Sequence, residues 1–284
     1  MIQFSDRHLS PIDLHTHTTA SDGLLSPDAL IALAKENSVK MLAITDHDTV
    51  AGYLSIKNAT RTIQLISGVE ISTTWSGIGI HIVGLDFDPH HPAIDTLLEK
   101  QASARRVRCQ SILTVLEKLG MPVSRAELIE QTGHTHIGRP HIARLLFKKG
   151  YVSSISQAFK KYLGSGKAGD IKNQWASLSA VVGAITTSGG VAVIAHPDKY
   201  KMTRTKLLRF IDEFVEMGGQ GIEVISGRQH RDITDKYAKI ANDRGLLASL
   251  GTDFHQRSPY YPEVGQLPTL PDDVNPVWSI FNRV

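Results

Sequence analysis

Short apolar runs alternate with amphipathic segments over most of this chain of 284 residues. Runs of about four to eight apolar residues predict buried strands, whereas apolar positions three or four apart predict helices that pack on a sheet. The predicted strands cover residues 39–44, 64–72, 81–85, 190–195, 221–225 and 246–250. The predicted helices cover residues 26–34, 51–61, 178–187, 203–217 and 230–243. This alternation predicts an α/β fold with βα units and a mainly parallel sheet.

The alternation is interrupted between Pro92 and Leu163, where strand-like runs disappear. Apolar residues at helical spacing from Ile94 to Leu119 predict one long helix, and shorter helices are predicted at 124–131, 140–149 and 153–162. We interpret residues 99–163 as a helical insertion. Residues 1–98 and 164–284 then form a catalytic barrel domain.

The insertion is basic. Between residues 101 and 161 the chain has eleven Lys or Arg against three Glu, a local net charge of +8 where the whole chain has +3. A concentration of positive charge next to a carboxylate-rich site predicts a basic lid that attracts an anionic substrate. The alternative is a solvated helical surface with no role in binding.

Composition narrows the class of protein further. Hydrophobic residues make up 41% of the chain, and no apolar run approaches the ~20 residues needed to cross a membrane. The first eleven residues lack the apolar segment of a secretory signal. Cys109 is the only cysteine, so the chain has no internal disulfide and no thiolate metal cluster. These features predict a cytoplasmic protein without a membrane partner, and no obligate protein partner is indicated.

Histidines and carboxylates are concentrated in four short stretches, each of which follows an apolar run. The stretches are Asp13–His17 with Asp22, Thr45–Asp48, Ala195–Pro197 and Gly251–His255. Strand side chains alternate between faces, so His15 and His17 can point at one ion while Leu14 packs in the core. The carboxyl ends of barrel strands form one face, where these side chains can meet. Imidazole and carboxylate ligands suit Mn²⁺, Zn²⁺ or Fe²⁺, so their joint occurrence predicts a centre with several metal ions.

In this order, the motifs resemble the PHP (polymerase and histidinol phosphatase) superfamily of metal-dependent phosphoesterases. The matching segments include Gly68-Val69-Glu70 and His81 and extend from Asp13 to His255. The resemblance implies a distorted, TIM-like, seven-stranded β/α barrel with three divalent ions at the strand ends. The implied ligand sets are His15, His17, Glu70 and Asp253; Glu70, His81 and His196; and Asp22, His47 and His255. The carboxylate of Asp22 favours Mn²⁺, with Zn²⁺ or Fe²⁺ as alternatives.

Within the superfamily, the segments Ser21-Asp22-Gly23 and Ile137–His141 and the insertion resemble the branch of 3′,5′-nucleoside bisphosphate phosphatases. Bacterial members of that branch also act as 5′-to-3′ exoribonucleases on short RNA. The resemblance implies hydrolysis of the 3′-phosphate of nucleotides such as adenosine 3′,5′-bisphosphate (pAp), through attack by a hydroxide that bridges two ions. The alternatives are a histidinol phosphatase or another phosphomonoesterase and, in a different class, a non-catalytic metal-binding module.

Four further residues are candidates for contacts with the substrate. Arg139 is the predicted phosphate clamp, since a guanidinium can bind two phosphate oxygens at once. Arg228 and His230 follow the strand at 221–225 and could face the phosphate, although an exposed helix start is an equal alternative. Lys199 is a further candidate for substrate binding. A catalytic role is assigned to Arg139 and His230.

Two other segments carry structural predictions. We interpret Asp46 and Asp48 as carboxylates that orient the metal ligand His47 and do not themselves bind metal. The segment Trp75–Gly79 has too few glycines for a dinucleotide-binding motif, and it is predicted to turn a β-hairpin.

Overall fold

The computed structural model describes residues 10–57, 62–134, 136–172 and 175–281. One sheet holds, in sequence order, β1 (Ile12–Asp13), β2 (Met41–Ile44), β3 (Gln64–Trp75), β4 (Ile78–Leu85), β5 (Val191–Ile194), β6 (Gly221–Ser226) and β7 (Leu247–Gly251). Neighbouring strands are parallel except at β4, which pairs antiparallel with β3 and with β5. The prediction of a mainly parallel sheet is therefore confirmed, and the Trp75–Gly79 segment does turn a hairpin, between β3 and β4.

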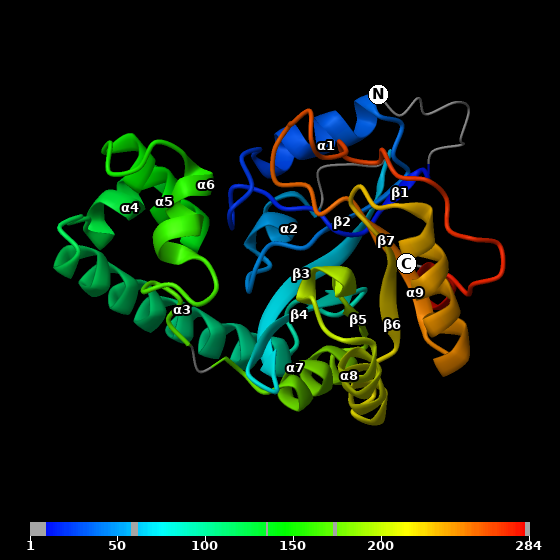
Figure 1. The fold of residues 1–284 in the computed structure, drawn as a ribbon. Coiled ribbons are helices and arrows are strands. Elements are labelled where there is room, and N and C mark those ends of the chain that lie inside the picture. The colour runs from blue at the N-terminus through cyan, green and yellow to red at the C-terminus, as the bar shows by residue number, and fades with distance from the viewer. Residues whose placement is uncertain (1–9, 58–61, 135, 173–174, 282–284) are drawn as a thin grey trace.

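The sheet curves until its first and last strands meet (Figure 1). The Leu14 backbone N–H donates to the Leu250 carbonyl over 3.1 Å, and the Asp253 N–H donates to the His15 carbonyl over 2.9 Å. Gly251 permits this approach, because a Cβ atom there would collide with the backbone and Cβ of His15. The result is a nearly closed barrel, which confirms the predicted distorted β/α barrel.

The helices that pack around the barrel are α1 (Pro27–Glu36), α2 (Ala51–Ile56), α7 (Leu178–Thr187), α8 (Arg204–Glu216) and α9 (Arg231–Arg244). Short 3₁₀ helices occupy Pro197–Tyr200 and Val277–Ile280. Helix α1 begins where predicted, because the Ser26 hydroxyl accepts from the Ala29 N–H over 3.2 Å and Pro27 fits the first turn. Helix α2 is shorter than predicted, and residues 58–61 of that prediction lie outside the described residues.

The barrel is filled with apolar side chains. Five strands or strand ends contribute to its interior, through Leu14, Ala43, Ile66, Val83 and Val193. A larger cluster joins the outer side of the sheet to the surrounding helices. As predicted, Leu14 is buried in this packing, while His15 and His17, which follow it in the chain, lie with Glu70 and Asp253. The ends of the strands are therefore mounted on a dry, closely packed core.

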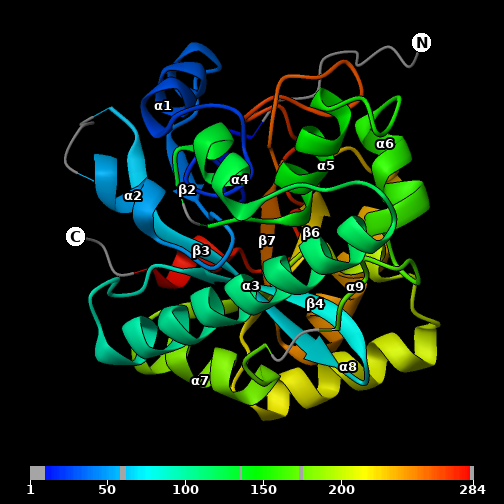
Figure 2. The ribbon, with the colours of Figure 1, turned by 90° about the vertical axis from the view of Figure 1, so that its left-hand side faces the viewer.

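The insertion consists of α3 (Pro92–Lys118), α4 (Arg125–Thr132), α5 (Arg139–Lys148) and α6 (Ile155–Ala158), followed by a π-helical turn at Phe159–Leu163. It has a hydrophobic cluster of its own, which includes Cys109, Leu116 and Leu146. Figures 1 and 2 show that α3 runs from the barrel to this second lobe. The predicted boundary at residue 98 lies inside α3: Ile94 and Leu97, before it, pack in the barrel cluster, and Cys109 and Leu116, after it, pack in the cluster of the insertion. Among the described residues, no helix is long and apolar enough to span a membrane.

Candidate metal centre

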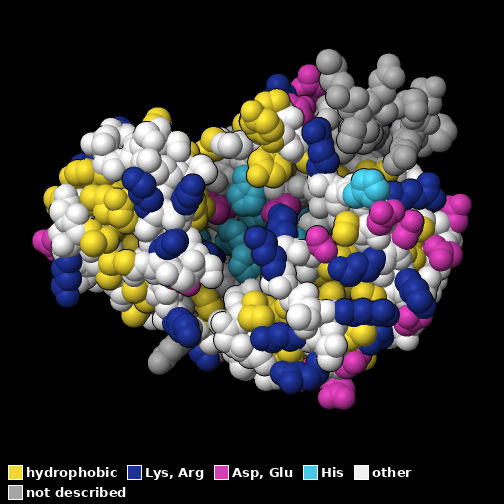
Figure 3. All heavy atoms as spheres, in the orientation of Figure 1, with side chains coloured by type: hydrophobic (Ala, Val, Ile, Leu, Met, Phe, Trp, Pro, Cys, Tyr) yellow, Lys and Arg dark blue, Asp and Glu magenta, His cyan; other side chains and the backbone are white. Residues whose placement is uncertain are grey.

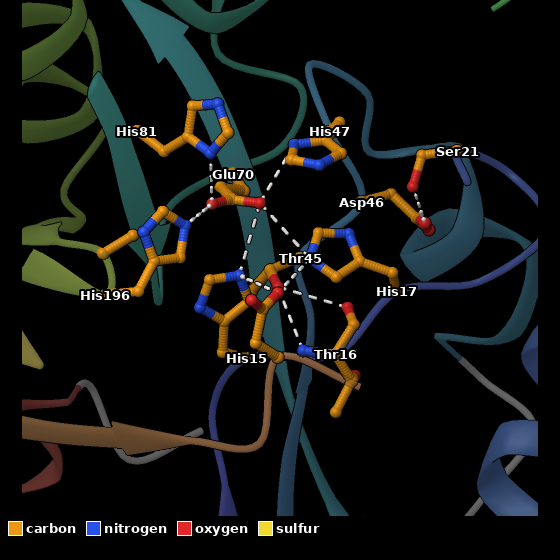
Figure 4. A network of polar contacts seen from close by, with 12 residues as sticks. His15, Thr16, His17, Ser21, Thr45, Asp46, His47, Glu70, His81 and His196 are labelled. Atoms are coloured by element: carbon orange, nitrogen blue, oxygen red, sulfur yellow. Dashed lines mark hydrogen bonds and ion pairs between the residues drawn. The ribbon is translucent and has the colours of Figure 1, made fainter. Parts of the chain in front are cut away.

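The buried Glu70 carboxylate of β3 lies among five imidazoles (Figure 4). Its Oε1 atom lies 2.8 Å from both His81 Nδ1 and His196 Nε2. The distances from its Oε2 atom are 2.9 Å to His47 Nδ1, 3.2 Å to His17 Nε2 and 3.3 Å to His15 Nε2. One strand residue therefore faces histidines from four separate segments of the chain, and its two oxygens face different histidines.

Eight of the nine predicted ligands form three overlapping groups, within each of which the ligand atoms lie within 4.8 Å of one another. The groups are His15, His17, Glu70 and Asp253; His47, Glu70 and His81; and His17, Asp22, His47 and His255. The first group is the set expected for the first ion. The second group has His47 where His196 was expected, and the third has His17 in addition to the expected Asp22, His47 and His255. The ninth residue, His196, meets the same Glu70 oxygen as His81.

Seven buried side-chain atoms of these residues have no hydrogen-bond partner within the described part of the chain. They are His15 Nε2, both ring nitrogens of His17, Asp22 Oδ1, His47 Nδ1, Glu70 Oε2 and His196 Nδ1. An unpaired buried polar atom costs about 1 to 3 kcal/mol, so such atoms are rare in folded proteins. Here several such atoms lie close together around Glu70 but are not aligned for hydrogen bonds to one another. A bound cation would satisfy them together. The residues therefore fit divalent metal ions.

Charge keeps the carboxylates ready to bind metal. Burial alone raises the pKa of the Glu70 carboxyl, but the charges of His47 and His81 outweigh burial and hold that pKa well below its usual range. Burial also raises the pKa of Asp253, and the charges of His15 and Lys199 likewise hold it well below the usual range. Both groups are ionised at neutral pH, which is the state in which a carboxylate binds metal.

Glu223, a residue that the sequence analysis did not single out, positions two members of the centre. Its Oε1 atom lies 2.5 Å from His15 Nδ1, and its Oε2 atom accepts from the His196 backbone N–H over 2.6 Å. A hydrogen bond donated by His15 Nδ1–H to Glu223 would leave Nε2, the ring nitrogen on the Glu70 side, as the atom that can bind a metal ion. The signal in the sequence was an acid inside the apolar run 221–225, where an unpaired charge would be costly.

The structure corrects our interpretation of Asp46. Its carboxylate accepts hydrogen bonds from the Thr18 N–H over 2.8 Å and from the Thr18 and Ser21 hydroxyls, each over 2.6 Å. It makes no hydrogen bond to the His47 imidazole among the described residues. Asp46 instead fixes the 18–21 loop, which leads directly to Asp22.

Asp48 also binds elsewhere than predicted. Its carboxylate accepts from the Ser72 N–H over 2.7 Å, from Gln101 Nε2 over 2.9 Å and from Arg105 Nε over 2.7 Å. Burial raises the pKa of this carboxyl, but Arg105 and the hydrogen bonds lower it to about 2. Asp48 thus anchors α3 of the insertion to β3, and it affects His47 only through the backbone.

Two members of the centre have strained backbones. The φ angles of His196 and Asp253 are 27° and 54°, in the left-handed region that non-glycine residues rarely adopt. The Tyr200 hydroxyl supports the first of these, because it donates to the Ala195 carbonyl over 2.8 Å and accepts from the His81 N–H over 3.0 Å. Strain of this kind persists where the surroundings hold a side chain in one functional direction.

The four predicted substrate contacts lie in different surroundings. Lys199 is hydrogen-bonded to the Asp253 carboxylate at the centre itself. Arg139 begins α5, donates to the Leu163 carbonyl over 3.1 Å and lies 3.7 Å from Asp170. Arg228 is exposed, and the side chain of His230, which caps α9, is 76% exposed.

The fold and the site together define a β/α barrel with histidines and carboxylates at the strand ends that could hold metal ions. The chain belongs to the PHP domain family, whose model matches residues 13–247. It is 42% identical to a 5′-3′ exoribonuclease of Haemophilus influenzae, over 95% of this chain and 98% of that protein. It is 39% identical to a 3′,5′-nucleoside bisphosphate phosphatase of Chromobacterium violaceum, over 95% of this chain and 96% of that protein.

A solved structure of an amidohydrolase from Chromobacterium violaceum, with bound sulfate and no metal, is also similar to this chain. It superposes with a TM-score of 0.88 at 39% identity, and the match covers 95% of each chain. The resemblance inferred from the motifs is therefore confirmed, and the relatives carry the kinds of activity that the resemblance implied.

Proposed function

We propose that this protein is a metal-dependent phosphoesterase that removes the 3′-phosphate of nucleoside 3′,5′-bisphosphates such as pAp. The observation that carries the proposal is the position of Glu70, whose two oxygens face different groups of histidines. A carboxylate placed in this way can bridge two ions, which is the arrangement of phosphoesterase centres with two or more metals. The bisphosphate phosphatase among the relatives supports the substrate class.

The proposed cofactor is three divalent ions, with Mn²⁺ preferred over Zn²⁺ or Fe²⁺. His15, His17, Glu70 and Asp253 would hold the first ion, Glu70, His81 and His196 the second, and Asp22, His47 and His255 the third. Three of these nine side chains, His17, His47 and Glu70, belong to two of the overlapping groups and would lie close to two ions. The mixture of nitrogen and carboxylate oxygen without thiolate suits Mn²⁺. When bound, such ions supply Lewis acidity and a water that ionises near neutral pH.

The side chains around the centre would then bind and orient the phosphate. Lys199, at the edge of the centre, would offset the negative charge on a non-bridging oxygen of the phosphate that is hydrolysed. We propose Arg139 as a second phosphate ligand, contributed by the insertion. Arg228 and His230 would contact only a substrate that extends to the open mouth of the site, because both are exposed.

A second activity, 5′-to-3′ trimming of short RNA, is favoured by the shape and charge of the same face. Figure 3 shows a hollow between the two lobes, with histidine side chains on its floor and Lys and Arg side chains on both sides. An open basic hollow can admit a polyanion longer than one nucleotide. The exoribonuclease among the relatives supports this activity. The insertion, residues 99–163, would act as the basic lid on this substrate.

We also propose a cytoplasmic location, which the buried single thiol of Cys109 suits.

A substrate panel tests the proposal. The wild-type protein with Mn²⁺ is assayed for phosphate release from pAp, 3′-AMP, 5′-AMP and histidinol phosphate, and for shortening of RNA labelled at either end. We expect the highest kcat/KM with pAp, no release from 5′-AMP, and loss of RNA nucleotides from the 5′ end. Release from histidinol phosphate alone would contradict the nucleotide substrate. Metal binding without any hydrolysis would favour the non-catalytic module.

Two variants make the panel specific to the centre. Glu70→Gln removes the bridging carboxylate and should abolish hydrolysis of every substrate. Glu99→Gln removes the same charge from an exposed position on α3 and should leave all rates unchanged. Equal rates for both variants would place the reaction elsewhere.

A further inference from the structure

Two consecutive tyrosines are exposed on the loop that follows His255, a member of the candidate metal centre. This loop, residues 256–263, contains Tyr260 and Tyr261, whose exposed fractions are 78% and 65%. These are the two highest values among the large hydrophobic side chains in the described part of the chain. A group of apolar side chains left open to water beside a site marks a surface that can bind a ligand.

The loop is fixed at both ends, so the exposure of its tip is a property of the fold. Phe254 before it and Val264 after it are buried in the same hydrophobic cluster. The Asp13 carboxylate joins the two ends. It accepts from the Thr252 N–H over 3.0 Å, from the Thr252 hydroxyl over 2.7 Å and from the Gly265 N–H over 2.9 Å. A loop with anchored ends loses less conformational freedom when its side chains bind a ligand.

The loop begins at the edge of the metal centre. His255 belongs to the group with Asp22 and His47, and its carbonyl accepts from the Leu24 N–H over 2.8 Å. The side chain of Leu24 is 49% exposed and adds to the apolar surface at this edge. The segment after β7, orange in Figure 1, passes along the upper edge of the hollow, and Figure 3 shows hydrophobic side chains there, directly above the histidines. A strand whose phosphate lies among the histidines can therefore reach the loop.

A basic wall lies on the other side of Leu24. Leu24 lines a cavity of about 330 Å³, whose lining also includes Arg144 and Lys148 of α5. Arg144 Nη2 donates to the Asp22 carbonyl over 2.7 Å, which holds this wall next to the centre, and Lys148 is exposed. Cations that attract a phosphate backbone and aromatic rings that stack on bases are the two elements of surfaces that bind single-stranded nucleic acid. An apolar peptide would leave these cations without counter-charges.

We propose that the 256–263 loop is a stacking platform for RNA, on which the rings of Tyr260 and Tyr261 bind bases on the 3′ side of the hydrolysed bond. The inference rests on the proposed function, because it requires 5′-to-3′ hydrolysis of RNA at the metal centre. Only the first nucleotide of such a strand precedes the hydrolysed bond, so every other base lies on its 3′ side. In pAp no nucleotide follows the 3′-phosphate, and this substrate does not reach the loop. The platform is tolerant of sequence, because every base has a face that can stack.

The first test compares substrates with and without bases beyond the hydrolysed bond. The proteins are the wild type, the double variant Tyr260→Ala/Tyr261→Ala and the matched control Tyr260→Phe/Tyr261→Phe, which keeps both rings. Their kcat/KM values are measured with Mn²⁺ for pAp and for release of the first nucleotide from a 5′-phosphorylated RNA hexanucleotide. Stacking of the usual strength corresponds to a loss of about 5- to 100-fold for the hexanucleotide in the alanine variant, mainly through a higher KM.

For pAp we expect less than a twofold change in the alanine variant, because this substrate has no base that could stack on the loop. The phenylalanine variant should match the wild type with both substrates. A similar loss for both substrates in the alanine variant, or no loss for the hexanucleotide, would overturn the platform.

A second test removes the partner of the rings from the substrate. The wild type and the alanine variant are compared on the hexanucleotide and on the same strand with abasic ribose at its second and third positions. The abasic strand should lower the kcat/KM of the wild type by the factor that the alanine substitutions cause with intact RNA. In the alanine variant it should cause less than a twofold further loss, because the two changes remove the same contact. Losses that multiply would show that the bases and the rings do not meet.

Binding is measured separately from turnover, by fluorescence anisotropy of a 3′-labelled hexanucleotide with Mn²⁺, whose first linkage is a hydrolysis-resistant methylphosphonate. The alanine variant should bind this strand about 5- to 100-fold more weakly than the wild type. If binding depends on the rings but no substrate is hydrolysed, the proposed function fails and the platform stands. If all three proteins shorten RNA at equal rates, the platform fails and the proposed function stands. A wild-type dimer that the alanine variant does not form in sedimentation, with unchanged RNA binding, would also overturn the platform and assign the loop to contacts between two copies of the chain.

Discussion

Replacing Glu223 by glutamine should weaken metal binding although Glu223 would contact no metal. The carboxylate accepts two hydrogen bonds, from His15 Nδ1 over 2.5 Å and from the His196 N–H over 2.6 Å. A glutamine amide has only one oxygen. If the oxygen faces His15, the amide N–H₂ opposes the N–H of His196, and two donors are buried against each other.

The other orientation of the amide has a different cost. If the N–H₂ group faces His15, the ring must accept at Nδ1 and carry its proton on Nε2, the atom that lies 3.3 Å from Glu70 Oε2. The nitrogen lone pair that would bind the metal is then lost. Either arrangement disturbs the centre. Removal of such an orienting group typically lowers metal affinity or activity about 10- to 100-fold, equivalent to about 1.4 to 2.7 kcal/mol.

The assay is a competition titration of metal-free protein with Mn²⁺, combined with the metal dependence of phosphate release from pAp. Glu216→Gln is the control, because it removes the same charge from an exposed position at the end of α8. The melting temperature of each metal-free variant shows whether the fold is intact. A folded Glu223→Gln protein with wild-type Mn²⁺ affinity would refute the orienting role.

Three further predictions concern the elements that hold the centre. Gln101→Leu should lower the free energy of unfolding by about 2 to 4 kcal/mol in urea denaturation, because it leaves Asp48 Oδ1, the Ser72 carbonyl and the Ala176 N–H with fewer partners. The control is Gln110→Leu at an exposed position of the same helix. Equal urea midpoints for the two variants would contradict a stabilising role of this hydrogen-bond network. Gly251→Ala should reduce the Mn²⁺ content of the purified protein, because the added Cβ collides with His15. Gly183→Ala, which has open space around its Cβ, should not change the metal content. Equal metal content in the two variants would show that the close approach of Gly251 to His15 is unimportant. Burial lowers the pKa of His141 to about 4, below its unfolded value of about 6.5. Its contribution to stability is therefore present above pH 6.5 and lost as the pH falls towards 4. His141→Gln should remove up to about 3 kcal/mol of this pH dependence, measured from unfolding curves at pH 7, 5.5 and 4.5, and a pH dependence equal to that of the wild type would contradict the prediction.

The sequence predicted the barrel and the candidate ligands because both depend on local signals. Apolar runs mark the strands, and a residue just past a strand end must lie on the catalytic face. Asp253 was found in this way and Glu70 through the resemblance of the motifs, and the structure brings both together with His15 and His17.

Contacts between distant segments were harder to predict. Nothing in the order of residues shows that Glu223 reaches His15, which is 208 positions away, or that Asp48 pairs with Arg105 on the insertion. The acids beside His47 were misinterpreted for the same reason, since their direction depends on the loop backbone. The positive φ of 51° at Asp48 is set by its tertiary partners, which the local sequence does not reveal.

The central claim is that these nine side chains bind divalent metal ions at one end of the barrel. Anomalous diffraction from crystals grown with Mn²⁺, recorded near the manganese absorption edge, tests this claim most directly. We expect three peaks at coordinating distance from these residues, with Glu70 between two of them. The absence of anomalous density at Glu70, in crystals whose Mn²⁺ binds elsewhere on the protein, would contradict the account.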